Sequence, residues 1–242
     1  AQNKPRLLLK ITAIFTLLGT LAVIAFITAI YLGEFGQLPT NAELRNIQNN
    51  SAAEIYTADS VLIGTYFIDN RINAEFAEIS PNIINALVAT EDARFFEHRG
   101  VDLRAALRVV FRSILMNDES SGGGSTLSQQ LAKNLFGRQN FSILTLPVNK
   151  IKEMIVAWRL EEVYGKEELL NLYLNTVPFS ENVYGVKVAA QRFFNVPPQD
   201  VTVEQAAVLV GMLKATSTYN PLRRPKKSLE RRNVVLGQMV KY

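Results

Sequence analysis

Cysteine is absent from this sequence of 242 residues, and histidine occurs only once, as His98. The absence of cysteine excludes disulfide scaffolds, zinc sites built on thiolates and thiol nucleophiles. A single histidine excludes a histidine-rich metal centre and any mechanism that needs two imidazoles. Apolar residues make up 48% of the chain, which is long enough to bury a core of its own.

Charge is missing from one long segment, between Ile11 and Gly33. As a helix this segment would rise roughly 34 Å, enough to cross a hydrocarbon core of about 30 Å. The basic residues before it and the acidic Glu34 after it place the N-terminus in the cytoplasm. We therefore expect a cytoplasmic stub over 1–10, a single transmembrane helix over 11–33 and the remainder outside. A buried helix of a soluble protein is the alternative.

The rest of the chain is close to neutral, because three of the 26 basic residues precede the apolar segment. A neutral body argues against a protein that binds nucleic acid. A membrane-tethered module that binds glycan or nucleic acid without chemistry remains the competing interpretation. Its best support is a late basic cluster without interleaved aromatic residues: Arg223, Arg224, Lys226, Lys227, Arg231 and Arg232.

The pattern after the apolar segment predicts a mainly α-helical protein with a small β element. Residues 34–53 are polar and turn-rich, as in a linker, and 54–78 suggest a β-hairpin with strands at 54–56 and 61–68. Beyond residue 79 the periodicity is helical. Ser80-Pro81 and Thr202-Val-Glu-Gln205 have the spacing of helix starts. Helices are expected at 81–91, 102–116, around 127–135, and at 148–164, 166–175, 186–194, 203–214 and 228–241.

Two acidic positions could carry chemistry. Glu91, followed by Asp92, ends an apolar helix, and a carboxylate in such surroundings suits a general base. Solvated acids at a helix end are the simpler alternative. Glu153 is a second, separated carboxylate, and two carboxylates are the minimum for glycosyl chemistry, including that of a muramidase-like hydrolase.

Several features suit an anionic ligand. Gly122–Thr126 enters a helix, where free N–H groups and hydroxyls can hold a phosphate, although it lacks the ending of an ATP-binding P-loop. The cations that follow suit a pyrophosphate leaving group: Lys133, Arg138, Lys150 and Lys152. Arg104, Arg108 and Arg112 line one face of the 102–116 helix, as either a solvated face or an anion-binding wall.

Taken in order, the motifs resemble the peptidoglycan glycosyltransferases, the family 51 glycosyltransferases. They read Glu91-Asp-x-x-Phe95-x-x-His98-x-Gly100; Gly123-Gly-Ser-Thr-Leu-Ser-Gln-Gln130 with Leu131-Ala-Lys-Asn134; Lys150-x-x-Glu153; Lys166-Glu-Glu-Leu-Leu-Asn-Leu-Tyr-Leu-Asn175; and Tyr219-Asn-Pro221 through Arg231-Arg-x-x-Val-Leu236. The segment 53–64 looks like the one before the transferase domain in bifunctional class A penicillin-binding proteins. No Ser-x-x-Lys motif occurs, so we expect no covalent penicillin binding within these residues.

The resemblance implies a lysozyme-like helical glycosyltransferase domain over 79–242 that polymerises lipid II outside the bacterial cytoplasmic membrane. Glu91 would be the general base that takes a proton from the acceptor 4-hydroxyl. The donor carbon is inverted, giving a β-1,4 glycan and releasing undecaprenyl pyrophosphate. Glu153 would be the second acid, and Lys133 and Arg138 would stabilise the pyrophosphate.

The resemblance also implies the residues that contact substrate and the partners. The substrate-binding residues would be Asp92, His98, Ser125, Thr126, Gln129, Gln130, Lys133, Asn134, Arg138 and Lys150. No cofactor is required, although a divalent cation, Mg or Mn, with Glu153 as a ligand stays open. Partners would be lipid II, the growing glycan strand, membrane lipids, other cell-wall synthesis proteins and moenomycin-type inhibitors, with no nucleic acid.

Three departures from the family pattern concern the site and one turn. Asn149 stands where an arginine is usual before Lys150, Gly122 replaces a common glutamine, and Leu213-Lys214 stands where proline is frequent. The first of these lowers the expected charge of the donor site.

One apolar segment, Phe141–Val148, lies between polar neighbours. It is either a core strand or buried loop, or a mobile flap that dips into the bilayer so that a lipid substrate enters sideways.

Overall fold

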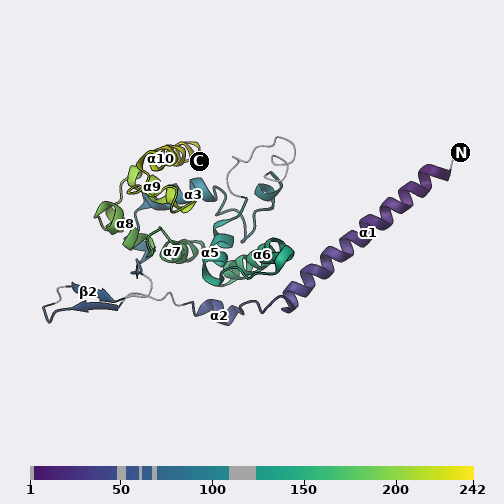
Figure 1. Cartoon of the computed structure of the whole chain (residues 1–242), viewed down its shortest axis with the longest axis horizontal. Helices are drawn as coiled ribbons and strands as arrows, with labels where there is room; N and C mark the ends of the chain where they lie inside the picture. The colour runs from purple at the N-terminus through teal and green to yellow at the C-terminus, as the bar shows by residue number, and fades with distance from the viewer. Residues whose placement is uncertain (1–2, 48–52, 60–61, 67–69, 109–123) are drawn as a thin grey trace.

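The computed structural model describes residues 3–47, 53–59, 62–66, 70–108 and 124–242 (Figure 1). A long first helix projects away from a helical body that holds most of the later elements. The mainly helical fold with one N-terminal apolar helix confirms the fold class expected from the sequence.

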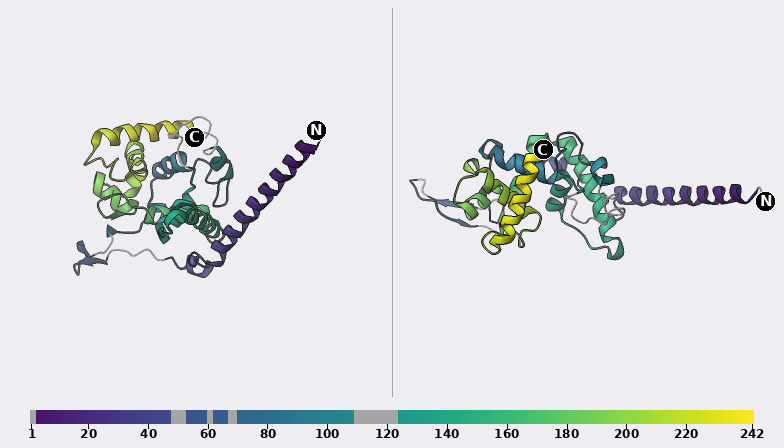
Figure 2. Two further views of the ribbon diagram at one scale, coloured as in Figure 1. Left: turned by 45° about the vertical axis from the view of Figure 1, so that its right-hand side comes forward. Right: turned by 90° about the horizontal axis from the view of Figure 1, so that it is seen from above.

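The first helix, α1, spans Asn3–Leu32. Its stretch Leu9–Leu32 is strongly apolar and almost entirely exposed, so by length and composition it could cross a membrane. Figure 2 shows it leaving the body at the end occupied by α6. The helix begins at Asn3, before the predicted span of 11–33, because the residues that precede the apolar segment are helical as well.

The predicted linker is partly ordered. A short helix, α2, spans Asn41–Arg45 within 34–53, which corrects the expectation of a plain linker. Thr40 and Glu43 form a reciprocal capping box at its start, with the Thr40 N–H donating to the Glu43 carboxylate over 2.7 Å. Leu44 on this helix is fully buried and belongs to the core of the body, so α2 packs on the body.

The β-hairpin is present, with β1 at Ala53–Tyr56 and β2 at Leu62–Tyr66 paired antiparallel. The predicted positions 61 and 67–68 lie outside the described residues. Beyond the hairpin, β3 (Asn70–Arg71) pairs in parallel with β4 (Val183–Tyr184), a contact that the predicted hairpin over 54–78 did not include. This pair ties the chain that leaves the hairpin to a distant part of the body.

Besides the helical residues 103–108, the described part of the body contains seven α-helices and three 3₁₀ turns. Their bounds are α3 Pro81–Glu91, α5 Leu127–Phe136, α6 Thr145–Val163, α7 Lys166–Thr176, α8 Val186–Phe194, α9 Val203–Leu213 and α10 Pro225–Lys241, with 3₁₀ turns at Phe76–Glu78, Ser142–Leu144 and Pro198–Asp200. Ser80 caps α3 with proline at its first position, and Thr202 and Gln205 form the predicted capping box on α9.

These helices pack as two groups (Figure 1). Helices α3, α9 and α10 contact one another, and α5 packs against both α6 and α7. Fully buried residues from both groups, among them Leu87, Leu131, Leu174 and Leu209, belong to one continuous core. The end of α3 and the middle of α5 face each other where the groups meet.

Two helices begin three residues before their predicted starts, α6 at Thr145 rather than 148 and α10 at Pro225 rather than 228. Proline at the first turn of α10 explains the second difference, since proline suits that position. In the predicted 102–116 helix, residues 103–108 are helical and the remainder lies outside the described residues. Leu103 and Leu107 are exposed in this described part.

Candidate active site

Glu91 is the last residue of α3, and its carboxylate lies where the two helix groups meet. The side-chain amide of Gln130, on α5, donates to Glu91 Oε2 over 3.0 Å. On the other side Arg231 of α10 brings its Nη2 to 3.7 Å from Oε1. The Glu91 side chain is only 14% exposed. A carboxylate with one firm hydrogen bond keeps free lone pairs for a substrate proton.

Tyr173, on α7, fixes the orientation of Gln130. Its hydroxyl donates over 3.0 Å to the Gln130 carbonyl oxygen, which leaves the amide nitrogen for Glu91. Desolvation raises the pKa of the Tyr173 hydroxyl, and the charge of Glu91 raises it further. The phenol therefore stays protonated and acts as a donor, so the carboxamide cannot reverse without losing both hydrogen bonds.

Asp92 and His98 organise the loop that follows Glu91. Both Asp92 carboxylate oxygens lie 3.0 Å from His98 Nε2, and one of them accepts the Leu127 N–H over 3.0 Å. Asp92 thus joins the end of α3 to the start of α5. Both residues were predicted to bind substrate; in the structure their described contacts hold the loop.

Gly100 in this loop approaches another helix very closely. Its φ is +81°, and a Cβ atom there would lie 2.8 Å from the backbone of Ala157 on α6. The Gly100 carbonyl accepts the hydroxyl hydrogen of Thr126 over 2.6 Å, and Thr126 in turn caps α5. Only glycine satisfies this backbone conformation and this space. The motif glycine therefore lets the loop seat between α5 and α6.

Lys150, on α6, lies at the centre of a second polar cluster. Its ammonium group donates to Ser125 Oγ over 2.6 Å, to Gln129 Oε1 over 2.8 Å and to Glu153 Oε2 over 3.3 Å. Desolvation lowers the pKa of Lys150; Glu153 opposes this shift, whereas the positive charges of Arg138 and of nearby Lys133 add to it. The sequence-predicted Ser125, Gln129, Lys133, Arg138, Lys150 and Glu153 are thus brought together.

Glu153 occupies the buried side of this cluster. Its Oε1 accepts from Arg138 Nε over 2.8 Å, and its Oε2 faces Lys150. Within the described residues no group of three or more histidine or acidic residues could hold a metal ion. Because both oxygens of Glu153 already face cations, this arrangement does not suit a divalent metal ion.

The two clusters share α5. Gln129 points to the Lys150 side and Gln130 to the Glu91 side, so adjacent residues serve both. No described hydrogen bond links Asn134 to either cluster. Lys152 donates instead to the Phe35 carbonyl, just after the end of α1. The predicted residues Gly122 and Gly123 lie outside the described residues.

Asn149, where the family pattern has arginine, has a structural role. Its side chain is buried, accepts the Gln139 N–H over 3.1 Å, and donates to the carbonyls of Gln139 and Thr145. It therefore closes the loop between α5 and α6. The charge that the usual arginine would bring is missing at this position.

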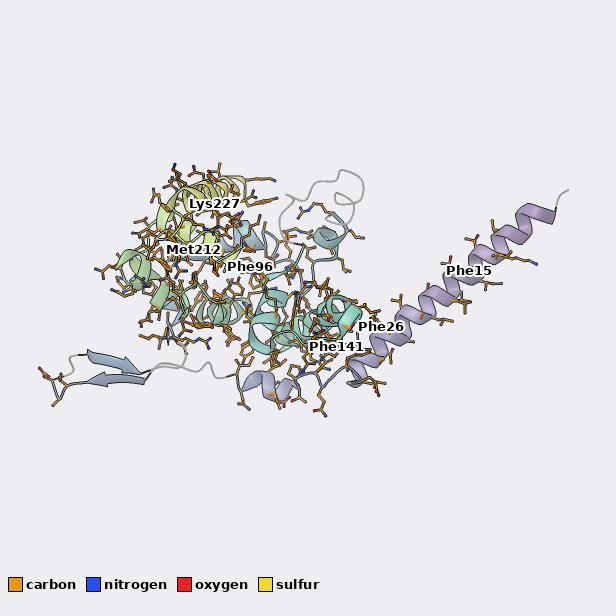
Figure 3. The ribbon with its side chains drawn as sticks, viewed as in Figure 1. Phe15, Phe26, Phe96, Phe141, Met212 and Lys227 are labelled. Atoms are coloured by element: carbon orange, nitrogen blue, oxygen red, sulfur yellow. The ribbon has the colours of Figure 1, made fainter. Side chains whose placement is uncertain are left out.

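The apolar segment Phe141–Val148 is neither a core strand nor a buried loop. It forms a 3₁₀ turn and the start of α6, with Ile143 91% and Leu146 71% exposed. Phe35 packs edge-to-face against both Phe141 and Phe26 of α1, with ring centroids 5.7 and 5.6 Å apart. Figure 3 shows Phe26 and Phe141 close together where α1 meets the body.

The outer face of α6 is fastened to the exit of α1. Lys152 Nζ donates to the Phe35 carbonyl over 2.6 Å, and Arg159 Nη1 donates to the Pro39 carbonyl over 2.7 Å. The Arg159 guanidinium also lies over the Tyr31 ring, 5.4 Å from its centroid. Lys150 and Glu153 occupy a different face of the same helix, so α6 connects the cluster around Lys150 with residues 35–39, which follow α1.

Sequence reasoning did not assign two residues beside Glu91. Tyr173 belongs to the fourth motif and Arg231 to the fifth, so membership of a motif was the available signal. Lys166 and Glu161 were also missed: Lys166 Nζ pairs with Glu161 over 2.6 Å and donates to the His98 carbonyl over 2.7 Å. They brace the loop after Glu91 from α6 and α7.

Comparison with known proteins agrees with these motifs. The family model for Transglycosylase matches residues 59–240. Penicillin-binding protein 1F of Bacillus subtilis (strain 168) is 36% identical over 93% of this chain, and penicillin-binding protein 1A of Escherichia coli (strain K12) is 39% identical over 84%. The matched parts are 30% and 23% of those proteins, so the chain spans less than a third of their length.

A solved structure also matches, that of penicillin-binding protein 1A from Haemophilus influenzae, with a TM-score of 0.42 and 27% identity over 80% of this chain and 18% of that one. The family match covers the second strand of the hairpin and almost the whole helical body. The resemblance drawn from the five motifs is confirmed, and this chain belongs to the Transglycosylase family.

Proposed function

We propose that this chain is a peptidoglycan glycosyltransferase that polymerises lipid II into β-1,4 glycan strands. The observation that carries the proposal is that α5 lies between two different sites and contributes a glutamine to each. One holds a carboxylate, Glu91, with lone pairs to spare, and the other gathers Lys150, Arg138 and Lys133. A base and a separate anion site are what attack by a sugar hydroxyl on a pyrophosphate-linked donor requires.

In the proposed reaction Glu91 takes the proton of the acceptor 4-hydroxyl as its oxygen attacks C1 of the donor sugar. The bond from C1 to the pyrophosphate oxygen breaks on the opposite face, so an α-linked donor becomes a β-linked product. The leaving pyrophosphate gains negative charge as that bond lengthens. Lys150, Arg138 and Lys133 oppose this charge, and Ser125 and Gln129 orient the Lys150 ammonium group.

Glu153 has a different part in this scheme. Its carboxylate binds Arg138 at one oxygen and Lys150 at the other, which keeps two cations close together before the substrate arrives. We propose no step through a divalent cation, since the described donor set does not suit one. Catalysis then rests on positioning and on charge stabilisation by side chains already in place.

The apolar turn before α6 supports a membrane setting for this chemistry. Exposed apolar side chains at Ile143 and Leu146 lie next to the aromatic contact with α1. We place α1 across the cytoplasmic membrane, with the N-terminus inside and the helical body outside. The turn would then rest in the lipid interface, where a lipid-linked donor can enter sideways.

The decisive experiment measures glycan polymerisation from lipid II in detergent. The parent chain should make polymer, whereas Glu91→Gln, which keeps the shape but removes the base, should make none. Glu97→Gln is the matched control, because Glu97 is exposed in the same loop. Polymer from Glu91→Gln would move the base elsewhere. A folded parent chain that binds lipid II without making polymer would favour the binding-module alternative.

A second experiment tests the membrane setting. Ile143→Ser with Leu146→Ser should raise the KM for lipid II severalfold in liposomes and leave it unchanged in detergent. Val240→Ser with Leu229→Ser, which removes two exposed apolar side chains from α10, serves as the control. An equal KM for the parent and the double variant in liposomes would refute contact between the turn and the lipid.

A further inference from the structure

Arg231 reaches the candidate base from a remote helix. It lies on α10, in the fifth motif, and its Nη2 is 3.7 Å from Oε1 of Glu91 at the end of α3. The Arg231 and Glu91 side chains are only 12% and 14% exposed, respectively. Little water therefore screens the attraction between their charges. The proposed reaction gives Arg231 no role.

The packing around Arg231 holds its side chain in one place. A Cβ atom on Gly211 would lie 3.1 Å from Arg231 Cγ, so a glycine on α9 makes room for the stem. The guanidinium lies 6.0 Å from the ring centroid of Tyr219. Arg231 Nε is buried and has no partner among the described residues, so the group is not held by a competing hydrogen bond at that nitrogen. Gly211 and Tyr219 thus direct this arginine toward α3.

Glu91 is therefore held from both sides. Gln130 donates to Oε2 and is itself fixed by Tyr173, while Arg231 faces Oε1. Two contacts on different oxygens restrict rotation about the last bond of the side chain, which one contact would leave open. The lone pairs left on the carboxylate then point in a constant direction.

We infer that Arg231 is a positioning residue that sets the orientation of the Glu91 carboxylate for proton abstraction. The inference rests on the proposed function, in which Glu91 is the base. A misplacement of about 1 Å at a reacting group can cost roughly a hundredfold in rate. Loss of Arg231 should consequently slow the chemical step and leave binding of lipid II nearly unchanged.

The test compares kcat and KM of the full chain with lipid II in detergent. Arg231→Met keeps the aliphatic stem against Gly211 and removes the charge, so we expect kcat to fall at least tenfold with KM within twofold of the parent value. Arg231→Lys, which keeps the charge on a different geometry, should recover part of the loss. Arg232→Met is the matched control, because the neighbouring Arg232 donates to Asn233 instead of facing Glu91, and its loss should leave kcat unchanged.

Chemical rescue separates positioning from a merely structural contact. Arg231→Ala opens space for added guanidinium, which should restore part of kcat, whereas Glu91→Gln should not respond. A parent-like kcat in Arg231→Met would overturn the inference, and so would a loss confined to KM or the absence of any guanidinium rescue. If Glu91→Gln itself makes polymer, the proposed base assignment has failed instead, so the two failures are distinguishable.

Discussion

The two glutamates of the site differ in what surrounds them. Glu91 faces one amide and one arginine at 3.7 Å, at the junction of α3, α5 and α10. Glu153 is 7% exposed and has a cation at each oxygen, Arg138 at 2.8 Å and Lys150 at 3.3 Å. Glu91 retains acceptor capacity, whereas that of Glu153 is largely engaged. Identical side chains can thus serve unlike roles, because their neighbours decide what each can still accept.

The rigidity of the two sites also differs. The partners of Glu91 are buried or nearly so, and Tyr173 is among the fully buried side chains of the core. The cations at Glu153 are more accessible, with Arg138 43% and Lys150 37% exposed. The surroundings of Glu91 therefore hold its carboxylate in a fixed direction. The cations at Glu153 are accessible to a ligand that arrives from solvent or lipid.

The largest difference in kcat between the two sites is expected when each glutamate is shortened by one methylene. Glu91→Asp moves the carboxylate away from Gln130 and should lower kcat by about a hundredfold, the cost of a misplacement near 1 Å. Glu153→Asp should cost much less, because the exposed Arg138 side chain can follow it. The measurement is kcat for lipid II polymerisation, with thermal melting as the check on folding. Equal losses in the two variants would remove the distinction.

The second prediction concerns pH. Because desolvation lowers the pKa of Lys150, its charge is lost as pH rises, at a pH below the ordinary lysine value of 10.5. The kcat/KM of the free enzyme should decline on that alkaline side by roughly tenfold for each pH unit. Lys150→Arg, with a guanidinium that stays charged, should move the decline upward. Lys152→Arg on the other face of α6 should leave it in place, and a shift in that control would contradict the assignment.

A smaller effect is expected from Tyr173→Phe. Loss of the hydroxyl leaves the Gln130 carboxamide held by Glu91 alone, so kcat should fall a few-fold while KM stays constant. The free energy of unfolding should drop by about 1 kcal/mol, the usual net worth of one hydrogen bond. Tyr164→Phe loses a comparable bond, to the Leu44 carbonyl over 2.5 Å, away from Glu91. A similar kcat loss in both variants would argue for a general structural effect.

The last prediction is that removal of divalent metal ions has no effect on polymerisation. Since both oxygens of Glu153 face cations, a chelator such as EDTA should leave polymerisation by the parent chain unchanged. Extensive dialysis followed by added Mg²⁺ or Mn²⁺ provides the complementary measurement. A large loss with EDTA that either ion restores would mean that the cationic cluster rearranges around a metal.

Local signals in the sequence predicted much of the fold. The uncharged segment indicated α1, and Ser80-Pro81 and Thr202–Gln205 marked the starts of α3 and α9. The same type of signal, Thr40 to Glu43, preceded the overlooked α2. The two-residue β3–β4 pairing could not be found this way, because residues 70 and 183 meet only through the tertiary fold.

In the candidate site, too, local sequence signals predicted some features, and others depend on the tertiary fold. Motif order indicated which residues belong to it, including Gln130 and Lys150, but not which oxygen each would contact. Asn149 illustrates the limit: read along the chain it is a missing charge, whereas in space it closes the loop before α6. The direction of Arg231 toward Glu91 depends on how α10 crosses α3, which no local pattern encodes.

The two faces of α6 affect how the enzyme and its lipid-linked donor meet. Lys152 and Arg159 are about 10 Å apart along the helix axis, so the contacts with the exit of α1 lie within two turns of the Lys150 cluster. In the proposed membrane setting the Lys150 cluster then stays at one height above the lipid. Enzyme and lipid-linked donor diffuse in the same plane, and the frequency of their collisions is set by the donor's density per unit area rather than by its bulk concentration.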